Sequence, residues 1–353
     1  MPITVRGIDD VREVMGEIVE RVEGVVIGLG EAIRLIAVAL LANGHVLLEG
    51  VPGVAKTTMV KGFARLLGLL GREEVIEGVP FRGFSRIQFT PDLLPSDITG
   101  SLVYNPVTRG FEPRFGPVFA YLVLADEINR ATPRTQSALL QAMQEKEVTI
   151  GDKTYRLEYR DRGKFFLVLA TQNPVEQEGT YPLPEAQLDR FLMRILIGYP
   201  ETLEDEKRIL RLHSSRLVEP VEDLEPIVEP GWLVAAQEIV ASHVAVSEEV
   251  LDYIARLLRA TRPEVFEPIA EYLELGASPR AGIALLRAAK AWAALEGRDS
   301  VEPRDVDAML FHVLNHRLIP RVEKLIEYEE KTRYGARARL IRDALELIRK
   351  TVG

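Results

Sequence analysis

The chain has 353 residues, 47% of them hydrophobic and 7% aromatic, so it is long enough to bury the cores of two domains. It contains no cysteine, which excludes disulfides and thiolate metal sites and is compatible with a cytoplasmic location. Its 53 acidic residues exceed its 44 lysines and arginines, and the net charge of −9 argues against broad non-specific binding to nucleic acid or to anionic membranes.

The apolar run at residues 35–42 is the longest candidate for a membrane segment. It is far shorter than the ~20 residues that a helix needs to span a bilayer. We therefore expect no insertion into a membrane.

A glycine-containing loop follows the apolar residues 45–49 and precedes residues 59–70, which have the spacing of an amphipathic helix. The order strand, loop, helix is typical of a phosphate-binding loop, in which backbone N–H groups and the helix N-terminus bind phosphate oxygens. Lys56 would reach the β- and γ-phosphates of a nucleotide, and the Thr57 hydroxyl would bind Mg²⁺. The alternative is a strand-to-helix turn that binds nothing. The loop consists of Gly50, Val51, Pro52, Gly53, Val54, Ala55, Lys56 and Thr57.

Ala55 departs from the general pattern of such loops, because a glycine usually precedes the lysine. An αR conformation tolerates the extra methyl group, whereas a positive φ does not. The alanine therefore fits this loop without strain only if its backbone is αR.

Five short apolar runs bounded by turn residues alternate with helical patterns. This pattern indicates a mostly parallel five-stranded sheet between helices, which is an α/β fold. The runs are residues 45–49, 86–89, 121–125, 165–170 and 192–197. Two insertions interrupt the pattern: residues 100–119 are too rich in glycine and proline for one helix, and residues 147–160 resemble a hairpin around Gly151-Asp152.

The pattern becomes almost wholly helical after Gly198-Tyr199-Pro200. We therefore predict an α/β domain at residues 1–200 and an all-α domain at residues 201–353. Residues 218–230 contain three prolines and five acidic residues, and we expect them to form a solvated linker. The predicted helices are residues 203–213, 232–241, 248–260, 280–295, 302–314 and 336–349.

Two acidic residues, Asp126 and Glu127, end the apolar run at residues 121–125. Asp126 is placed to hold a hydrated Mg²⁺, and Glu127 to polarise a water molecule for attack on a γ-phosphate. The second carboxylate favours hydrolysis over binding alone. The alternative is a buried strand that ends in two solvated acids.

Asn173 follows the next buried run, at residues 165–170. Its amide can both donate and accept, so it could bond the attacking water or a γ-phosphate oxygen. The alternative is a turn-forming asparagine before Pro174.

These residues resemble the MoxR family of AAA+ ATPases, and the resemblance covers most of the chain. It implies an α/β nucleotide-binding domain followed by an all-α lid, with ATP and Mg²⁺ as cofactors. Its specific phrases are residues 49–57, 89–100, 125–131, 170–174 and 185–191. The family shares Ala55, so this departure from the general loop does not weaken the match.

The resemblance implies roles for further residues. Arg190 is similar to an arginine finger supplied to the ATP of a neighbouring subunit, where a guanidinium suits the charge that develops on the γ-phosphoryl group. Arg280 is similar to the second sensor, at the start of a lid helix. The alternative for Arg190 is a surface pair with Asp189. The nucleotide-binding set is Val26, Ile27, Gly28, Gly50, Val51, Pro52, Gly53, Val54, Ala55, Lys56, Thr57, Thr58 and Asp126.

An arginine finger that acts in trans implies a homo-oligomeric ring, most simply a hexamer. Family resemblance implies remodelling or activation of a partner protein, with partners that carry a von Willebrand factor A domain. Tyr104, Phe111 and Phe115 in the first insertion are candidate substrate contacts, or else they pack locally. The alternatives are a DNA-associated ring motor, which the acidic charge balance disfavours, and a nucleotide switch that does not hydrolyse.

Two weaker patterns point elsewhere. His312 and His316 stand four residues apart on a predicted helix but lack an acidic third ligand for zinc. The basic tail at residues 331–342 contains enough nearby acidic residues to be a solvated helix face rather than a nucleic-acid site.

Overall fold

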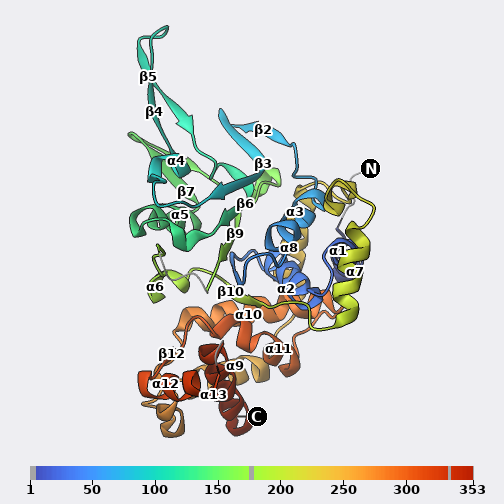
Figure 1. Cartoon of the computed structure of the whole chain (residues 1–353), viewed down its shortest axis with the longest axis vertical. Coiled ribbons are helices and arrows are strands. Elements are labelled where there is room, and N and C mark those ends of the chain that lie inside the picture. The colour runs from blue at the N-terminus through green and yellow to red at the C-terminus, as the bar shows by residue number, and fades with distance from the viewer. Residues whose placement is uncertain (1–4, 175–178, 333–334, 353) are drawn as a thin grey trace.

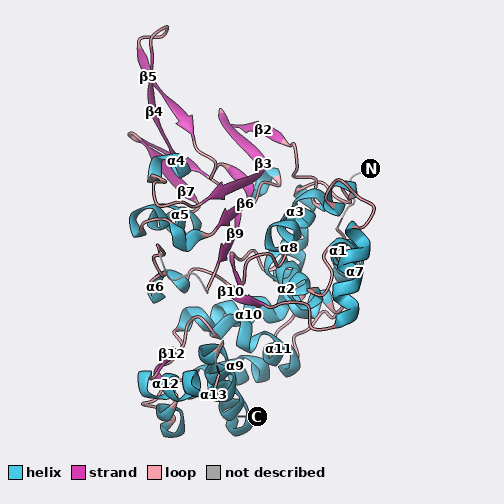
Figure 2. Cartoon of the chain, viewed as in Figure 1, coloured by secondary structure: helices cyan, strands magenta, loops and turns pink. Residues whose placement is uncertain are grey.

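The computed structural model describes residues 5–174, 179–332 and 335–352. Its N-terminal part is built on a six-stranded sheet with the order β10-β1-β9-β6-β3-β2 (Figures 1 and 2). The five strands from β10 to β3 are parallel, and β2 pairs antiparallel with β3 at one edge. The strands are β1 (Val46–Gly50), β2 (Glu73–Ile76), β3 (Val79–Gln88), β6 (Ala120–Asp126), β9 (Leu167–Gln172) and β10 (Met193–Ile197).

The five predicted strands are confirmed, and the α/β class with them. The predicted number of five is wrong, because β2 adds an antiparallel sixth strand. Glu73 and Val75 of β2 are exposed, so this edge strand lacks the apolar run that marks a buried parallel strand. Strand β3 begins at Val79, well before the predicted run. The prediction missed this first half because alternate residues of the strand are buried, so it contains no continuous apolar run.

Helices cover the sheet and continue into the C-terminal part of the chain (Figure 2). The N-terminal helices are α1 (Ile8–Val25), α2 (Gly30–Leu41), α3 (Lys56–Leu66), α4 (Pro95–Thr99), α5 (Pro133–Glu145) and α6 (Glu185–Leu188). The C-terminal helices are α7 (Leu203–His213), α8 (Gly231–His243), α9 (Glu248–Ala260), α10 (Pro279–Leu295), α11 (Pro303–Leu314), α12 (Val322–Lys331) and α13 (Ala336–Val352). The helical C-terminal region is therefore confirmed. The exception is a small antiparallel pair, β11 (Leu273–Leu275) with β12 (Ile319–Pro320).

The apolar core is continuous from α1 to α13. Two buried amides connect the N- and C-terminal parts: Gln237 Nε2 donates to the Leu40 carbonyl at 2.8 Å, and Asn315 Nδ2 donates to the Arg194 carbonyl at 2.9 Å. The domain boundary at residue 200 stays a prediction.

The expected solvated linker at residues 218–230 is packed against α3 instead. Val221 and Val228 are buried. The Ile227 N–H donates to the Leu66 carbonyl at 2.9 Å, and Arg65 Nε donates to the Leu224 carbonyl at 2.9 Å. The prediction of a solvated linker is therefore wrong. It relied on the acidic and proline-rich composition of the segment and did not take account of the apolar residues Val221 and Val228.

Both insertions are hairpins, and the first extends away from the sheet at the top of Figure 1. Tyr104 and Phe111 are exposed on it, with ring centroids 5.6 Å apart. Phe115 instead packs on Phe119 and Tyr155, at 4.9 and 5.0 Å, so the alternative of local packing holds for this ring. The hairpins are β4 (Gly100–Asn105) with β5 (Gly110–Phe115), and β7 (Glu147–Ile150) with β8 (Lys153–Arg156).

His312 and His316 do not share a helix as predicted, because α11 ends at Leu314, and the two side chains have separate structural partners. His312 Nε2 lies 3.4 Å from Glu31 Oε1, and His316 Nε2 lies 3.2 Å from the buried Phe191 carbonyl. Within the described ranges, no helix is both long and apolar enough to cross a bilayer.

Candidate active site

The loop between β1 and α3 has left-handed backbone at two positions. Gly53 has φ 81°, and Ala55 has φ 53° and ψ 22°. Ala55 therefore has the positive φ that an alanine tolerates poorly, not the αR conformation that would accept its methyl group without strain. An alanine in the left-handed region costs about 1–2 kcal/mol, which the surrounding loop must offset. The strained residue is the N-cap of α3 and directly precedes Lys56, the first residue of that helix. It is therefore part of the turn that sets the direction of the helix N-terminus.

Of the two glycines in this loop, Gly50 is the one that space requires. A Cβ atom there would lie 2.4 Å from the Ile197 carbonyl oxygen of β10. The Gly50 carbonyl accepts a hydrogen bond from Lys56 Nζ, which also lies 3.5 Å from the Gln172 carbonyl of β9. The lysine thus folds back over the carboxyl ends of two neighbouring strands.

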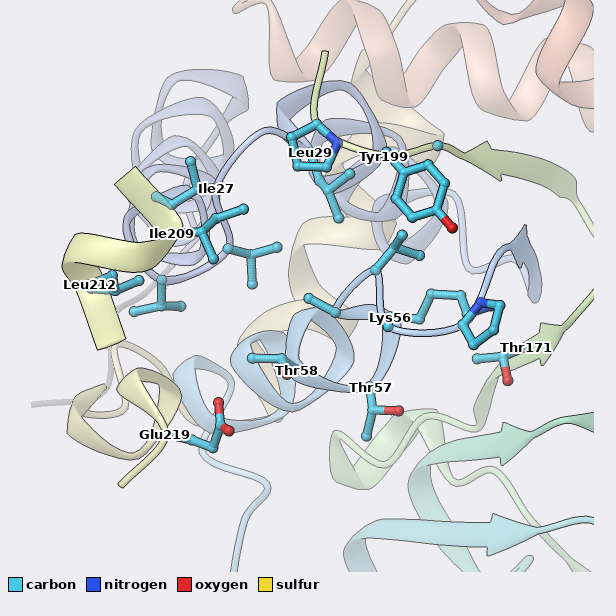
Figure 3. Close-up of a pocket in the computed structure, with 18 of the residues that line it drawn as sticks. Ile27, Leu29, Lys56, Thr57, Thr58, Thr171, Tyr199, Ile209, Leu212 and Glu219 are labelled. Atoms are coloured by element: carbon cyan, nitrogen blue, oxygen red, sulfur yellow. The ribbon is translucent and has the colours of Figure 1, made fainter. Parts of the chain in front are cut away.

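A cavity of about 650 Å³ lies over this loop and the carboxyl ends of the strands (Figure 3). It brings together Lys56, Thr57, Asp126, Glu127 and Asn173, which come from three separate segments of the chain. The predicted loop residues Pro52, Gly53, Val54, Ala55 and Thr58 also line it. Gly50 and Val51 are not among its lining residues.

Asp126 is buried, and both of its carboxylate oxygens have partners. The Thr171 hydroxyl donates to Oδ1 at 2.6 Å. Arg86 donates to Oδ2 through Nη2 at 2.6 Å and through Nε at 3.0 Å. Neither Arg86 nor Thr171 was assigned a role from the sequence.

Glu127 has left-handed backbone, with φ 55°, directly after the end of β6. Its N–H donates to the Thr171 hydroxyl at 2.8 Å. Its carboxylate Oε2 accepts from Gln88 Nε2 at 2.7 Å and lies 3.2 Å from Arg130 Nε. The turn separates the two carboxylates, so that Asp126 stays buried while Glu127 is partly exposed at the cavity wall.

Asn173 is buried at the cavity wall, just beyond β9. Its backbone carbonyl accepts from Asn129 Nδ2 at 3.3 Å. This contact ties the end of β9 to the turn after β6, and both segments carry residues of the site.

The other half of the cavity is mainly apolar. Val26 and Ile27 line it, and Leu29 joins them (Figure 3). Gly28 does not line the cavity; its backbone has φ 80°, and a Cβ atom there would lie 3.2 Å from Pro200 Cβ. Further lining residues had no assigned role from the sequence: Tyr199, Pro200, the α7 residues Glu206, Ile209, Leu212 and His213, and Glu219.

Arg190 and Arg280 lie outside the residues that line this cavity. Arg280 Nη1 lies 3.6 Å from Asp189 Oδ2, and Arg317 Nε lies 2.7 Å from Asp189 Oδ1. Burial lowers the pKa of Arg317, and its bond to Asp189 opposes that shift. Asp189, which lies between α6 and β10, therefore connects this part of the chain to Arg280 and Arg317 of the C-terminal part.

The lining residues fit a magnesium nucleotide. Backbone amides at the N-terminus of α3 and the Lys56 ammonium suit phosphate oxygens. Thr57 and Asp126 provide the hydroxyl and carboxylate oxygens that Mg²⁺ prefers. The apolar half has the character expected for a base.

Comparison with known proteins decides the family. Residues 45–193 match the ATPase family associated with various cellular activities (AAA), and residues 267–332 match the AAA lid domain. Chaperone MoxR1 of Mycobacterium tuberculosis is 43% identical over 309 residues, covering 87% of this chain and 76% of that protein. Protein MoxR of Methylorubrum extorquens is 32% identical, covering 97% of this chain and 96% of that protein. The chain belongs to the MoxR family of AAA+ ATPases.

The three-dimensional likeness of this MoxR-family ATPase extends over nearly its whole length. The crystal structure of a candidate ATPase from Cytophaga hutchinsonii matches with a TM-score of 0.78 and 41% identity, over 95% of both chains. The resemblance inferred from the motifs is therefore confirmed, as is the assignment to the ATPases.

Proposed function

We propose that this MoxR-family ATPase hydrolyses ATP with Mg²⁺ in the described cavity and uses the reaction to remodel or activate a partner protein. One observation carries the proposal: Asp126 and Glu127 line the same cavity as Lys56 and Thr57. A phosphate-binding loop alone could serve a passive nucleotide switch. A partly exposed carboxylate beside it adds a group that can activate water.

The roles follow from the chemistry of each side chain. Backbone amides of residues 53–57 and the Lys56 ammonium bind the phosphates, while Thr57 and Asp126 hold Mg²⁺. When bound, Mg²⁺ neutralises negative charge on the phosphate oxygens. Glu127 orients a water molecule and accepts its proton, and the Asn173 amide bonds that water or the γ-phosphate.

The apolar half of the cavity holds the base between the chain around Ile27 and the inner side of α7. Ile209 and Leu212 are three residues apart on α7 and line the cavity together. Because α7 begins the predicted C-terminal domain, the same nucleotide contacts both predicted domains. Through this contact, hydrolysis of the nucleotide would change the angle between the two predicted domains.

Arg280 would couple the lid to the γ-phosphate. It stands in the first turn of α10 and pairs with Asp189 at 3.6 Å, outside the cavity wall. We propose that it exchanges Asp189 for the γ-phosphate when the lid closes, which turns the presence of that phosphate into a lid position.

Arg190 would act on the ATP of the neighbouring subunit, in a homo-oligomeric ring that is most simply a hexamer. Its location outside the cavity of its own chain is compatible with this role. The proposed partner is a protein with a von Willebrand factor A domain, and the proposed setting is the cytoplasm. The exposed Tyr104 and Phe111 are candidate contacts with that partner.

The test compares Glu127→Gln with the unaltered chain. We expect the variant to bind ATP normally and to lose about 10²- to 10⁴-fold in phosphate release, since only water activation is removed. Steady-state phosphate release and equilibrium nucleotide binding measure the two effects. Glu145→Gln, an exposed residue at the end of α5, is the matched control. Near-normal turnover in Glu127→Gln would remove this residue as the base.

A further inference from the structure

Arg86 bonds one carboxylate oxygen, Oδ2, of Asp126, the residue that is proposed to hold Mg²⁺. Its Nη2 and Nε both donate to Asp126 Oδ2, at 2.6 and 3.0 Å. The other oxygen, Oδ1, accepts from the Thr171 hydroxyl at 2.6 Å. The aspartate is thus held on one side by a neutral group and on the other by a cation.

The pairing of β3 with β6 explains how Arg86 reaches this position. In the parallel register, Gln88 lies beside Asp126 and Arg86 lies beside Leu124. Side chains two residues apart on a strand share a face, so Arg86, Gln88 and Asp126 face the same side of the sheet. The Gln88 amide oxygen accepts from Arg86 Nη2 at 3.0 Å, which steadies the guanidinium beside the carboxylate.

The two partners of this ion pair differ in exposure. The Arg86 side chain is 48% exposed, whereas that of Asp126 is 11% exposed. Arg86 can therefore withdraw into solvent at little desolvation cost, while Asp126 stays in place on Thr171. A carboxylate oxygen that bonds a guanidinium is also less available to a second cation, because both draw on the same negative charge.

We propose that Arg86 is a positioning residue that competes with Mg²⁺ for Asp126 Oδ2 and so weakens binding of the magnesium nucleotide relative to the metal-free nucleotide. This inference rests on the proposed function of the cavity. The ion pair keeps the buried carboxylate satisfied between nucleotides, and the arriving divalent ion replaces it.

The experiment measures dissociation constants of the fluorescent nucleotide mant-ADP for the full chain, once with excess EDTA and once with saturating Mg²⁺ at matched ionic strength. For Arg86→Met we expect an unchanged constant in EDTA and a constant about three- to tenfold lower in Mg²⁺. This range assumes a charged hydrogen bond weakened by solvent exposure. Arg86→Lys keeps the charge and loses the paired donors, so its Mg²⁺ constant should lie in between.

Arg82→Met is the matched control, because Arg82 is an exposed arginine on the same face of β3, next to Ala120 in the register rather than near Asp126. It should leave both constants unchanged. Thermal unfolding checks that every variant folds.

Three results would overturn the proposal. In the first two, Arg86→Met leaves the Mg²⁺ constant unchanged or raises it, which would make Arg86 a bystander or a support for the metal site. In the third, Arg82→Met lowers the constant equally, which would reduce the effect to general charge. Failure of the unaltered chain to bind mant-ADP in either condition would instead remove the proposed function, and this inference with it.

Discussion

The Thr171 hydroxyl connects the two acidic residues of the site by donating to Asp126 Oδ1 at 2.6 Å. The same oxygen accepts from the Glu127 N–H at 2.8 Å. One side chain at the end of β9 therefore positions both the carboxylate proposed to hold the metal and the backbone of the proposed base.

Replacing Thr171 by valine should damage both stability and turnover. The change keeps the shape but leaves a buried carboxylate oxygen and a backbone N–H without this partner, which costs about 1–3 kcal/mol of unfolding free energy. We expect kcat to fall roughly tenfold to a hundredfold, since the Asp126 carboxylate and the Glu127 backbone lose their common support. Urea unfolding and steady-state phosphate release measure the effects. Thr171→Ser, which keeps the hydroxyl, should retain most of both; a fully active valine variant would contradict the assigned role.

Replacing Arg190 by alanine should separate binding from turnover. We expect normal nucleotide affinity and a fall of about a thousandfold in kcat, because the finger acts only on the developing charge. Mixing Arg190→Ala with Lys56→Ala chains should restore part of the activity, since a Lys56→Ala subunit still offers Arg190 to an intact neighbouring loop. If mixed assemblies are shown by light scattering and no activity returns, the in-trans role is wrong.

Ala55→Gly should stabilise the protein. The left-handed backbone at Ala55 strains an alanine and suits a glycine, although glycine loses more chain entropy on folding. The balance predicts a gain of about 0.5–1 kcal/mol in unfolding free energy. Ala255→Gly, at an exposed helical position in α9, should instead lose about 1 kcal/mol. Urea unfolding compares the two, and a loss of stability at residue 55 would contradict the strain argument.

His45 should make the fold sensitive to acid. Burial lowers its pKa from 6.5 to about 3, and its Nδ1 accepts from the Val168 N–H at 3.0 Å, a bond that protonation would break. The unfolded chain binds a proton below pH 6.5 and the folded chain does not. Stability from this residue is therefore complete above pH 6.5 and is lost as the pH falls toward 3, by up to about 1.4 kcal/mol per pH unit.

Urea unfolding between pH 7 and pH 4.5 measures that slope. His45→Gln should reduce it by about one proton, while the exposed His243→Gln should leave it unchanged. Equal slopes in the unaltered chain and in His45→Gln would show that other groups dominate the acid response.

Local patterns in the sequence were sufficient to predict the parallel strands and several of the helices. Continuous apolar runs identified the five parallel strands, and the spacing on α7 and α9 placed those helices at their observed bounds. The edge strand β2 and the start of β3 were not predicted, because these half-exposed segments contain no continuous apolar run. Thr171 could have been found by the reasoning used for Asn173, since it too is a polar residue at the end of a buried strand.

The sequence by itself determined the family, the loop that carries Lys56 and Thr57, and the pair Asp126-Glu127, because a strand followed by specific polar residues is a local signal. Only the tertiary structure placed Arg86 on Asp126, Thr171 between the Asp126 carboxylate and the Glu127 N–H, and Ile209 and Leu212 in one cavity with Ile27. These contacts join residues far apart in the chain, and they depend on strand register and helix packing. Strand register and helix packing cannot be inferred from the few residues on either side of a given position.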